Sequence, residues 1–226
     1  MNPCIIYASN EPGSATNGTP FNRAVMHAAK IVDTKDASGI RSALHFTIIG
    51  DTVYVAGTDG ARLNLGSFPS DSAGVPPGLL ERIGGGYPLF QFKEKRKTSV
   101  ILTGQVHAAS LGWRKAIGME PDEMSHPGRA TCQAAGYRYV GEMGLSTDCL
   151  GNFMGELGRY CGKYLNHQYL EDVVGKARLT VQAFVAEDRL ILLDKTHYPD
   201  RPLIHGIAFR HNMDLLTLDA EKPGAE

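Results

Sequence analysis

The sequence predicts an α+β fold of two repeated domains, each with helices packed on curved antiparallel sheets. Each half of the chain runs in a similar order, from a helix through short strands and a second helix to further strands. The chain has 226 residues, which is enough for two domains of ordinary size. Any α+β chain cut in two also looks roughly repetitive, so internal duplication is one of two interpretations of this order.

The clearest single element is a helix that begins after Thr19. The Thr19 hydroxyl can cap the helix, and Pro20 is favoured at the first helical position. Apolar residues then recur at helical spacing on one face, at Phe21, Ala24, Val25, Ala28 and Val32. The spacing predicts a helix that packs this face against the first sheet.

The other elements follow from apolar runs separated by turn residues. In the first half we expect a short helix near 78–83 and strands near 4–8, 43–49, 52–57, 61–66, 88–93 and 97–103. In the second half we expect helices at 106–117 and after Asn166, and strands near 129–135, 137–143, 162–165, 178–186, 189–194 and 202–209. Residues 145–161 fit either a helix or a strand. These elements place the domains at 1–104 and 105–215, followed by a polar tail at 216–226.

Composition and charge exclude several classes of protein. Hydrophobic residues make up 42% of the chain and charged residues 21%, as in a soluble globular protein. No apolar run is long enough to cross a membrane, and the N-terminus lacks the order of a signal peptide, so we expect a cytoplasmic protein. The formal net charge is -1, so any contact with nucleic acid has to come from a local basic face.

The sequence contains no local catalytic or metal-binding motif. The four cysteines lack CxxC spacing, the histidines form neither HxxxH nor HExxH, and the glycine run at 84–86 lacks the Lys-Ser/Thr of a phosphate loop. We therefore expect reduced thiols, no metal, no cofactor and no enzymatic activity. A Cys-His pair that is distant in sequence, as in an enzyme of unrelated fold, remains open.

The turn at residues 58–63 is the most informative local pattern. Residues 53–57 alternate as a strand, Asp59-Gly60 suits a tight turn with positive φ, and Leu63 begins the next strand. Together with the preceding helix and strand, the string Thr-Asp-Gly-x-Arg-Leu resembles the second domain of the bacterial DNA polymerase III β subunit, the β sliding clamp. A second stretch, Tyr-Leu-Asn-His-Gln-Tyr-Leu-Glu-Asp-Val at 164–173, resembles the last clamp domain. The resemblance covers residues 20–66 and 162–210.

The resemblance implies a DNA-clamp-like fold and a role in DNA replication, as a sliding clamp or processivity factor that forms a homo-oligomer around duplex DNA. Bacterial clamps carry three such domains, whereas this chain has room for two and resembles the second and third. The Met-Pro-x-Arg string that ends bacterial clamps is replaced here by Ile-Ala-Phe-Arg at 207–210. These differences keep open an alternative, a clamp-fold interaction module that binds a protein partner without encircling DNA.

The resemblance also implies two sites. In a clamp the first helix lines the hole, so Arg23, His27 and Lys30, which share a helix face, would contact phosphates without reading bases, and Arg114 and Lys115 would repeat this weakly. The turn would help to form an apolar pocket for polymerase or clamp-loader peptides, lined by Thr58, Gly60, Arg62, Leu63, Ile207 and Phe209. The ordinary alternatives are a solvated helix face for the first set and a structural hairpin for the second.

Overall fold

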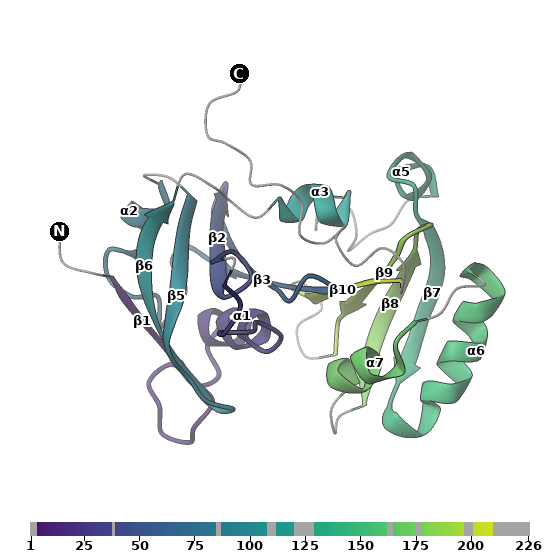
Figure 1. The fold of residues 1–226 in the computed structure, drawn as a ribbon, viewed down its shortest axis with the longest axis horizontal. Helices are drawn as coiled ribbons and strands as arrows, with labels where there is room; N and C mark the ends of the chain where they lie inside the picture. Colours follow the sequence, from purple (N-terminus) through teal and green to yellow (C-terminus); the bar gives the residue numbers. More distant parts are fainter. Residues whose placement is uncertain are drawn as a thin grey trace. The chain divides into compact units, whose positions relative to one another are not determined.

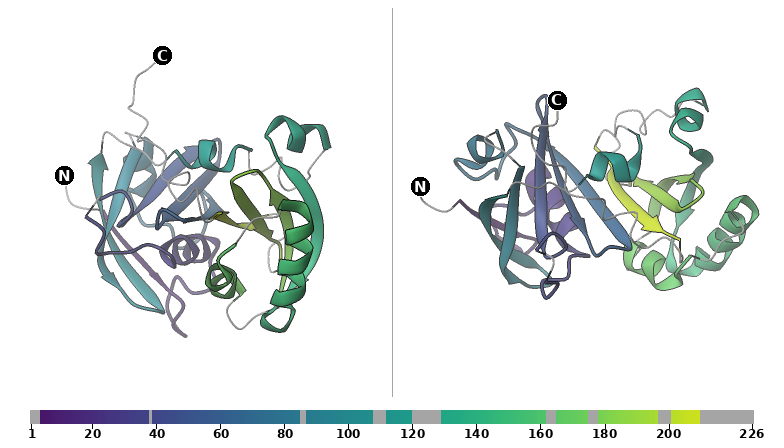
Figure 2. Two further views of the ribbon diagram at one scale, coloured as in Figure 1. Left: turned by 45° about the vertical axis from the view of Figure 1, so that its right-hand side comes forward. Right: turned by 45° about the horizontal axis from the view of Figure 1, so that its top comes forward.

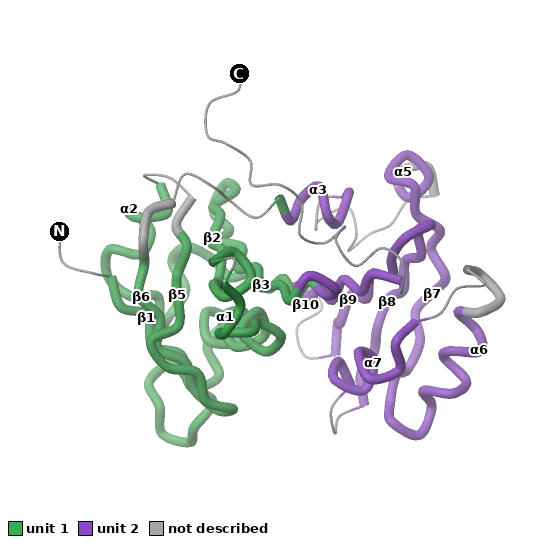
Figure 3. The backbone as a smooth tube through the Cα atoms, in the orientation of Figure 1, with its two compact units in different colours: residues 1–59, 63–112, 219–226 green, residues 60–62, 113–218 purple. Residues whose placement is uncertain are grey.

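The computed structural model describes residues 4–37, 39–84, 87–107, 112–119, 129–161, 165–174, 178–196 and 201–209. The chain separates into two compact units, which Figure 3 draws in different colours. The N-terminal unit contains residues 1–59 and 63–112, and the C-terminal unit contains 60–62 and 113–218. The division after residue 112 lies beyond the expected boundary at 104, because the last strand of the first unit continues to His107. The tail expected at 216–226 lies outside the described residues.

The N-terminal unit is a six-stranded antiparallel sheet with helices (Figure 1). Its elements in chain order are β1 (Ile5–Ser9), α1 (Pro20–Ala29), β2 (Ala43–Ile49), β3 (Thr52–Thr58), β4 (Arg62–Pro69), α2 (Leu79–Gly84), β5 (Tyr87–Lys95) and β6 (Ser99–His107). The strands lie in the order β1-β6-β5-β2-β3-β4. One core cluster joins α1 and α2 to this sheet, so a single apolar layer holds the unit together.

The helix α1 begins as its sequence predicts. Thr19 is the N-cap, its Oγ1 accepts a hydrogen bond from the backbone N–H of Asn22 at 3.1 Å, and Pro20 occupies the first turn. Phe21 is fully buried and meets Phe68 edge-to-face at a centroid distance of 5.3 Å. The cap and this aromatic contact therefore fix the start of α1 against β4.

Two glycines allow α1 to approach the sheet closely. A Cβ atom on Gly57 would lie 2.3 Å from the carbonyl oxygen of Ala28, and one on Gly66 would lie 2.7 Å from the Cα of Ala24. Ala24 and Ala28 are one helical turn apart, so α1 rests on β3 and β4 through its smallest side chains. The contact leaves no room for a side chain at either glycine.

The C-terminal unit is a four-stranded antiparallel sheet with helices (Figure 2). Its described elements are α3 (Trp113–Ile117), α5 (Arg129–Ala134), β7 (Arg138–Leu145), η1 (Thr147–Cys149), α6 (Leu150–Cys161), α7 (His167–Val174), β8 (Leu179–Val185), β9 (Arg189–Asp194) and β10 (Leu203–Ala208). The strands lie in the order β10-β9-β8-β7. Apolar side chains from α6 and α7 share one core cluster with β8 and β9.

Two sequence expectations for the second half are corrected, and one open alternative is decided. The helix expected at 106–117 begins only at Trp113, because residues 106 and 107 pair with β5 as the end of β6; residues 108–111 lie outside the described part. The strand expected at 129–135 is the helix α5, whose alanines favour a helix and which ends at Ala134, two residues before Gly136 with φ 75°. In the segment 145–161, Leu145 ends β7 and the residues from 147 onward form η1 and α6, while residues 162–164 of the expected strand are not described.

The structure confirms the predicted α+β class, with helices packed on antiparallel sheets. Every strand pair between described residues is antiparallel. The cap expected at Asn166 is present as well, since its Oδ1 accepts a hydrogen bond from the backbone N–H of Gln168 at 3.0 Å. The two helix caps that the sequence predicts, at Thr19 and Asn166, are therefore both present.

We predict that Gly57→Ala lowers the free energy of unfolding by about 1–3 kcal/mol, because the new methyl group has to displace the backbone of α1. Urea unfolding followed by circular dichroism measures the change. Gly155→Ala is the matched control, because Gly155 lies in α6 with no atom within 4 Å of a Cβ placed there. The control should be neutral or stabilising. Equal stability of Gly57→Ala and wild type would contradict the close packing.

Candidate functional site

The basic face expected on α1 is only partly on the surface. His27 is 8% exposed, and the Nε and Nη2 atoms of Arg23 are enclosed by protein. Lys30, which follows the last turn of α1, is exposed. The β4 strand lies against this end of α1, where Asn64 donates a hydrogen bond to the backbone carbonyl of His27 at 2.9 Å. Of the three residues, Lys30 presents its side chain to solvent most openly.

The short helix α3 carries the other two predicted basic residues. Arg114 and Lys115 are exposed, while Trp113, Ala116 and Ile117 are buried. The alternation follows from the helix, since residues 113, 116 and 117 share one face. The structure thus places two adjacent cationic side chains on the surface of the C-terminal unit.

The turn at residues 58–63 forms the predicted hairpin. Thr58 pairs with Leu63 in the β3–β4 ladder, and Gly60 has φ 93°, a conformation that favours glycine. Thr58 and Leu63 have no solvent-exposed surface, and Gly60 is buried. These three residues therefore support the turn from within and offer little surface to a ligand.

Arg62 is bound by the helix α7. Its Nη1 donates to Oδ2 of Asp172 at 2.5 Å, and its guanidinium carbon lies 4.5 Å from the centre of the Tyr169 ring. The other carboxylate oxygen of Asp172 accepts a hydrogen bond from Gln168 at 3.3 Å. The Arg62 side chain is only 15% exposed. Stacking and ion pairing together fix its planar head against α7.

The end of β10 lies beside the same turn. The backbone N–H of Ala208 donates to the carbonyl of Ala61 at 2.9 Å, and that of Phe209 donates to the carbonyl of Asp188 at 2.9 Å. Ile207 and Phe209 are 1% and 3% exposed and belong to the core of the C-terminal unit. Within the C-terminal unit the structure therefore brings Ala61 and the segment at 207–209 together, with Ile207 and Phe209 in the core.

Sequence reasoning did not assign Tyr169 and Asp172 to the site. Both belong to the stretch at 164–173 that resembles the last clamp domain. Their separation of three residues places them on one face of α7. No local pattern in the sequence indicates that Arg62 pairs with Asp172, because the two residues are 110 positions apart. Only the folded C-terminal unit makes them neighbours.

The described part of the chain holds no group of three or more His, Cys, Asp or Glu side chains placed to share a metal ion. Its cysteines Cys4, Cys132 and Cys149 are free thiols, and burial raises the pKa of Cys4 and Cys132. Among the described helices, none has the length and hydropathy needed to span a bilayer.

We predict a favourable coupling of about 1–2 kcal/mol between Arg62 and Asp172 in a double-mutant cycle of Arg62→Ala and Asp172→Ala. The coupling arises because the guanidinium is mostly shielded from water and therefore from solvent screening. Urea unfolding of the four proteins measures it.

The matched control is the ion pair between Arg96 and Glu94, whose side chains are 68% and 40% exposed. An exposed pair of this kind should couple by less than about 0.5 kcal/mol. Equal coupling in the two cycles would show that Arg62 has no special environment.

Of the comparisons with known proteins, the one with solved structures finds similar chains. No protein-family model matches the chain, and no curated protein sequence matches it. Among solved structures, the chain is similar to the β subunit of DNA polymerase III from Pseudomonas aeruginosa, with a TM-score of 0.45, 12% identity, and coverage of 92% of this chain and 67% of that one.

Two further bacterial structures give similar values. The DNA polymerase III β chain from Streptococcus pneumoniae TIGR4 has a TM-score of 0.43 and 12% identity, with 92% of this chain and 64% of that one covered. The Helicobacter pylori β clamp bound to a DNA ligase peptide has a TM-score of 0.42 and 11% identity, with 92% and 66% covered. The chain spans about two thirds of the length of these proteins. The three structures to which the chain is similar are thus bacterial DNA polymerase III β subunits or β clamps.

Proposed function

We propose that this protein is a clamp-like processivity factor that assembles from several copies around duplex DNA and captures peptides of replication proteins. It acts by binding and not by catalysis. The proposal of assembly rests on the distribution of exposed apolar side chains over the two sheets. The contacts with DNA and with peptides are argued below from separate surfaces.

Exposed large apolar side chains in the described part of the chain lie only on two strands. Ile5 and Tyr7 of β1 are 50% and 43% exposed, and Tyr139 of β7 is 38% exposed. In the described sheets β1 pairs only with β6, and β7 pairs only with β8. A strand with one free edge and apolar side chains is a template for pairing with another chain. Pairing of β1 in one copy with β7 in the next would join copies head to tail.

The DNA contacts would come from exposed cations. Lys30 at the end of α1 and the adjacent Arg114 and Lys115 of α3 are the predicted basic residues with exposed side chains. Lysine and arginine on a surface that meets a duplex bind phosphates and read no base, so binding would be independent of sequence and weakened by salt. Such contacts suit a protein that slides.

The peptide site would lie on the surface formed by Arg62 and α7. Tyr169 is partly buried and stacks under Arg62, which gives an apolar ring and a planar cation side by side. An aromatic residue and an arginine are the residue types that most often dominate peptide binding. The structure of the Helicobacter pylori β clamp bound to a DNA ligase peptide motivates the proposal that this chain binds replication peptides.

A second candidate is a clamp-fold module that binds proteins without encircling DNA. The burial of His27 and the enclosure of two Arg23 nitrogen atoms favour it, because they reduce the basic surface on α1. The two candidates differ in one measurable property, which is topological retention on circular DNA.

We predict that wild-type protein assembled on a nicked plasmid remains bound during gel filtration and is released when the plasmid is cut to a linear form. Replacement of Lys30, Arg114 and Lys115 by Gln should weaken retention and reduce the slope of log K against log salt by up to about 3. Tyr7→Lys and Tyr139→Lys should each abolish assembly in analytical ultracentrifugation, because a charge would be buried between strands.

The matched control replaces three other exposed lysines, Lys35, Lys93 and Lys97, by Gln. This variant carries the same change in net charge and should be retained like wild type. A strict monomer at all concentrations, or equal retention on circular and linear DNA, would exclude the ring and leave the second candidate.

We predict that a fluorescent peptide with the DNA ligase segment binds the wild-type protein and that Tyr169→Ser weakens binding at least about 10-fold, as expected for an aromatic anchor. Fluorescence anisotropy measures the affinity. Gln133→Ser is the control, because Gln133 is an exposed helical residue on α5, outside the surface formed by Arg62 and α7. Equal affinity of Tyr169→Ser and wild type, or no binding by wild type, would show that the turn is only a structural hairpin.

A further inference from the structure

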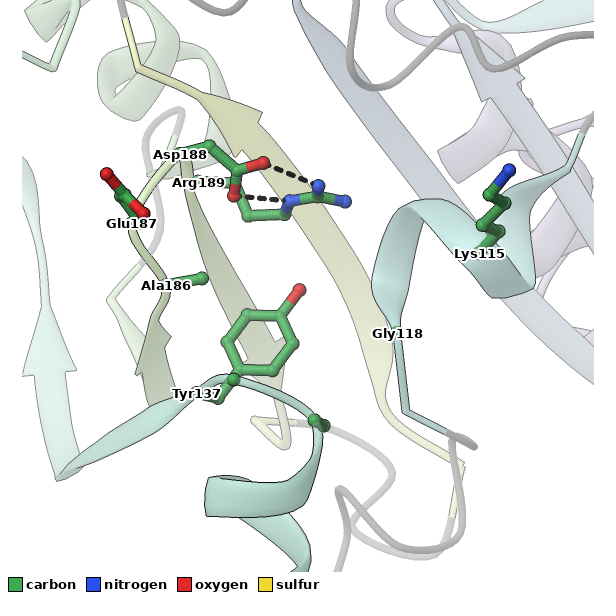
Figure 4. A pocket seen from close by; sticks show the side chains of 9 residues that line it. Lys115, Gly118, Tyr137, Ala186, Glu187, Asp188 and Arg189 are labelled. Carbon is green, nitrogen blue, oxygen red and sulfur yellow. Dashed lines mark hydrogen bonds and ion pairs between the residues drawn. The ribbon is translucent and has the colours of Figure 1, made fainter.

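A pocket of about 490 Å³ opens in the C-terminal unit, away from the residues assigned to DNA or peptide binding apart from Lys115 (Figure 4). Three turns form it: the end of α3 at Gly118, the connection from α5 to β7 at residues 135–137, and the β8–β9 turn at residues 186–189. Its volume lies within the range of roughly 300–1,000 Å³ that is typical of small-ligand sites.

The hydroxyl of Tyr137 is available to donate a hydrogen bond to a ligand in the pocket. The residue is 5% exposed, lines the pocket and directs its hydroxyl toward Asp188 and Arg189 in Figure 4. Within the described part of the chain, this hydroxyl makes no hydrogen bond. Burial raises the pKa of Tyr137, so its phenol stays protonated and able to donate at neutral pH.

Arg189 adds further donors beside Tyr137. Its Nε and Nη2 donate to the two carboxylate oxygens of Asp188 at 2.8 and 2.7 Å, and its Nη1 donates to the carbonyl of Ala116. A guanidinium has five N–H donors, so two remain for a ligand. Each oxygen of the Asp188 carboxylate accepts one of these bonds. The donors beside the Tyr137 hydroxyl are therefore its own O–H and the two remaining N–H groups of Arg189.

The charges around the pocket disfavour an anion. The Asp188 carboxylate offsets the positive charge of Arg189, and Glu187 adds a second carboxylate in the same turn. Lys115 lies on the opposite side of the pocket, on α3. Converging donors without a surplus of positive charge suit a neutral acceptor, such as an amide carbonyl, better than a carboxylate or phosphate.

We propose that this pocket binds the main chain of a short neutral peptide segment, whose carbonyl oxygen accepts hydrogen bonds from the Tyr137 hydroxyl and the remaining Arg189 donors. The glycines at both walls, Gly118 and Gly136, leave room for a backbone to enter. The site is separate from Arg62 and Tyr169, and it requires neither ring assembly nor DNA.

The test is a titration of the ¹⁵N-labelled full chain with acetyl-triglycine amide, followed through the backbone amide signals of Gly118 and Gly136. We expect saturable shifts of these signals. Tyr137→Phe keeps the ring and removes the donor, and it should weaken binding about 3- to 10-fold. Tyr54→Phe is the matched control, because Tyr54 is also a buried tyrosine but lies on β3 and does not line the pocket, and it should bind like wild type.

Two further ligands test which chemical features of the peptide the pocket recognises. Acetyl-triglycine with a free carboxylate should bind more weakly than the amide, and uridine, a neutral ligand with a different carbonyl geometry, should bind more weakly still. No saturable shift, equal binding by Tyr137→Phe and wild type, or tighter binding of the carboxylate or of uridine would overturn the proposal. Failure of the DNA or ligase-peptide experiments would leave these results unchanged.

Discussion

The fold of the N-terminal unit depends on the contact between α1 and the glycines of β3 and β4. Because Gly57 and Gly66 lack side chains, the backbone of α1 reaches the sheet, and Phe21 can then fill the space beside Phe68. The same proximity lets Asn64 reach the carbonyl of His27. A helix held this closely cannot turn about its axis. The absence of side chains at Gly57 and Gly66 therefore determines the orientation of every side chain on α1.

Local signals in the sequence predicted much of the fold, and long-range packing accounts for what they missed. The Thr19 cap, Pro20 and the Asn166 cap act through neighbouring residues, so the chain itself carries the information. The helix expected at 106–117 was misplaced because a strand partner 18–20 residues earlier, in β5, pairs with residues 106 and 107. No periodicity within the segment reports such a partner.

The candidate site shows the same division. The turn at residues 58–63 was predicted from its residues, and its Gly60 has the expected positive φ. The environment of Arg62 was not predictable, because Asp172 and Tyr169 reach it only after α7 has packed on its sheet. His27 is the opposite case: its position in the helix pattern indicated a surface residue, and packing of a neighbouring strand buried it.

The β-bulge in β7 has a consequence for the behaviour of the protein at high concentration. A contact between two different strand edges joins copies head to tail. If the rotation between successive copies does not close a ring, each added copy presents the same free edge and a filament grows. The ladder of β7 shifts register between Tyr139 and Gly141, where Gly141 has φ 143°. A bulged edge is twisted and accepts an incoming strand in few registers. In the proposed assembly this irregularity would therefore limit indiscriminate fibre formation at the strand that also carries the exposed Tyr139.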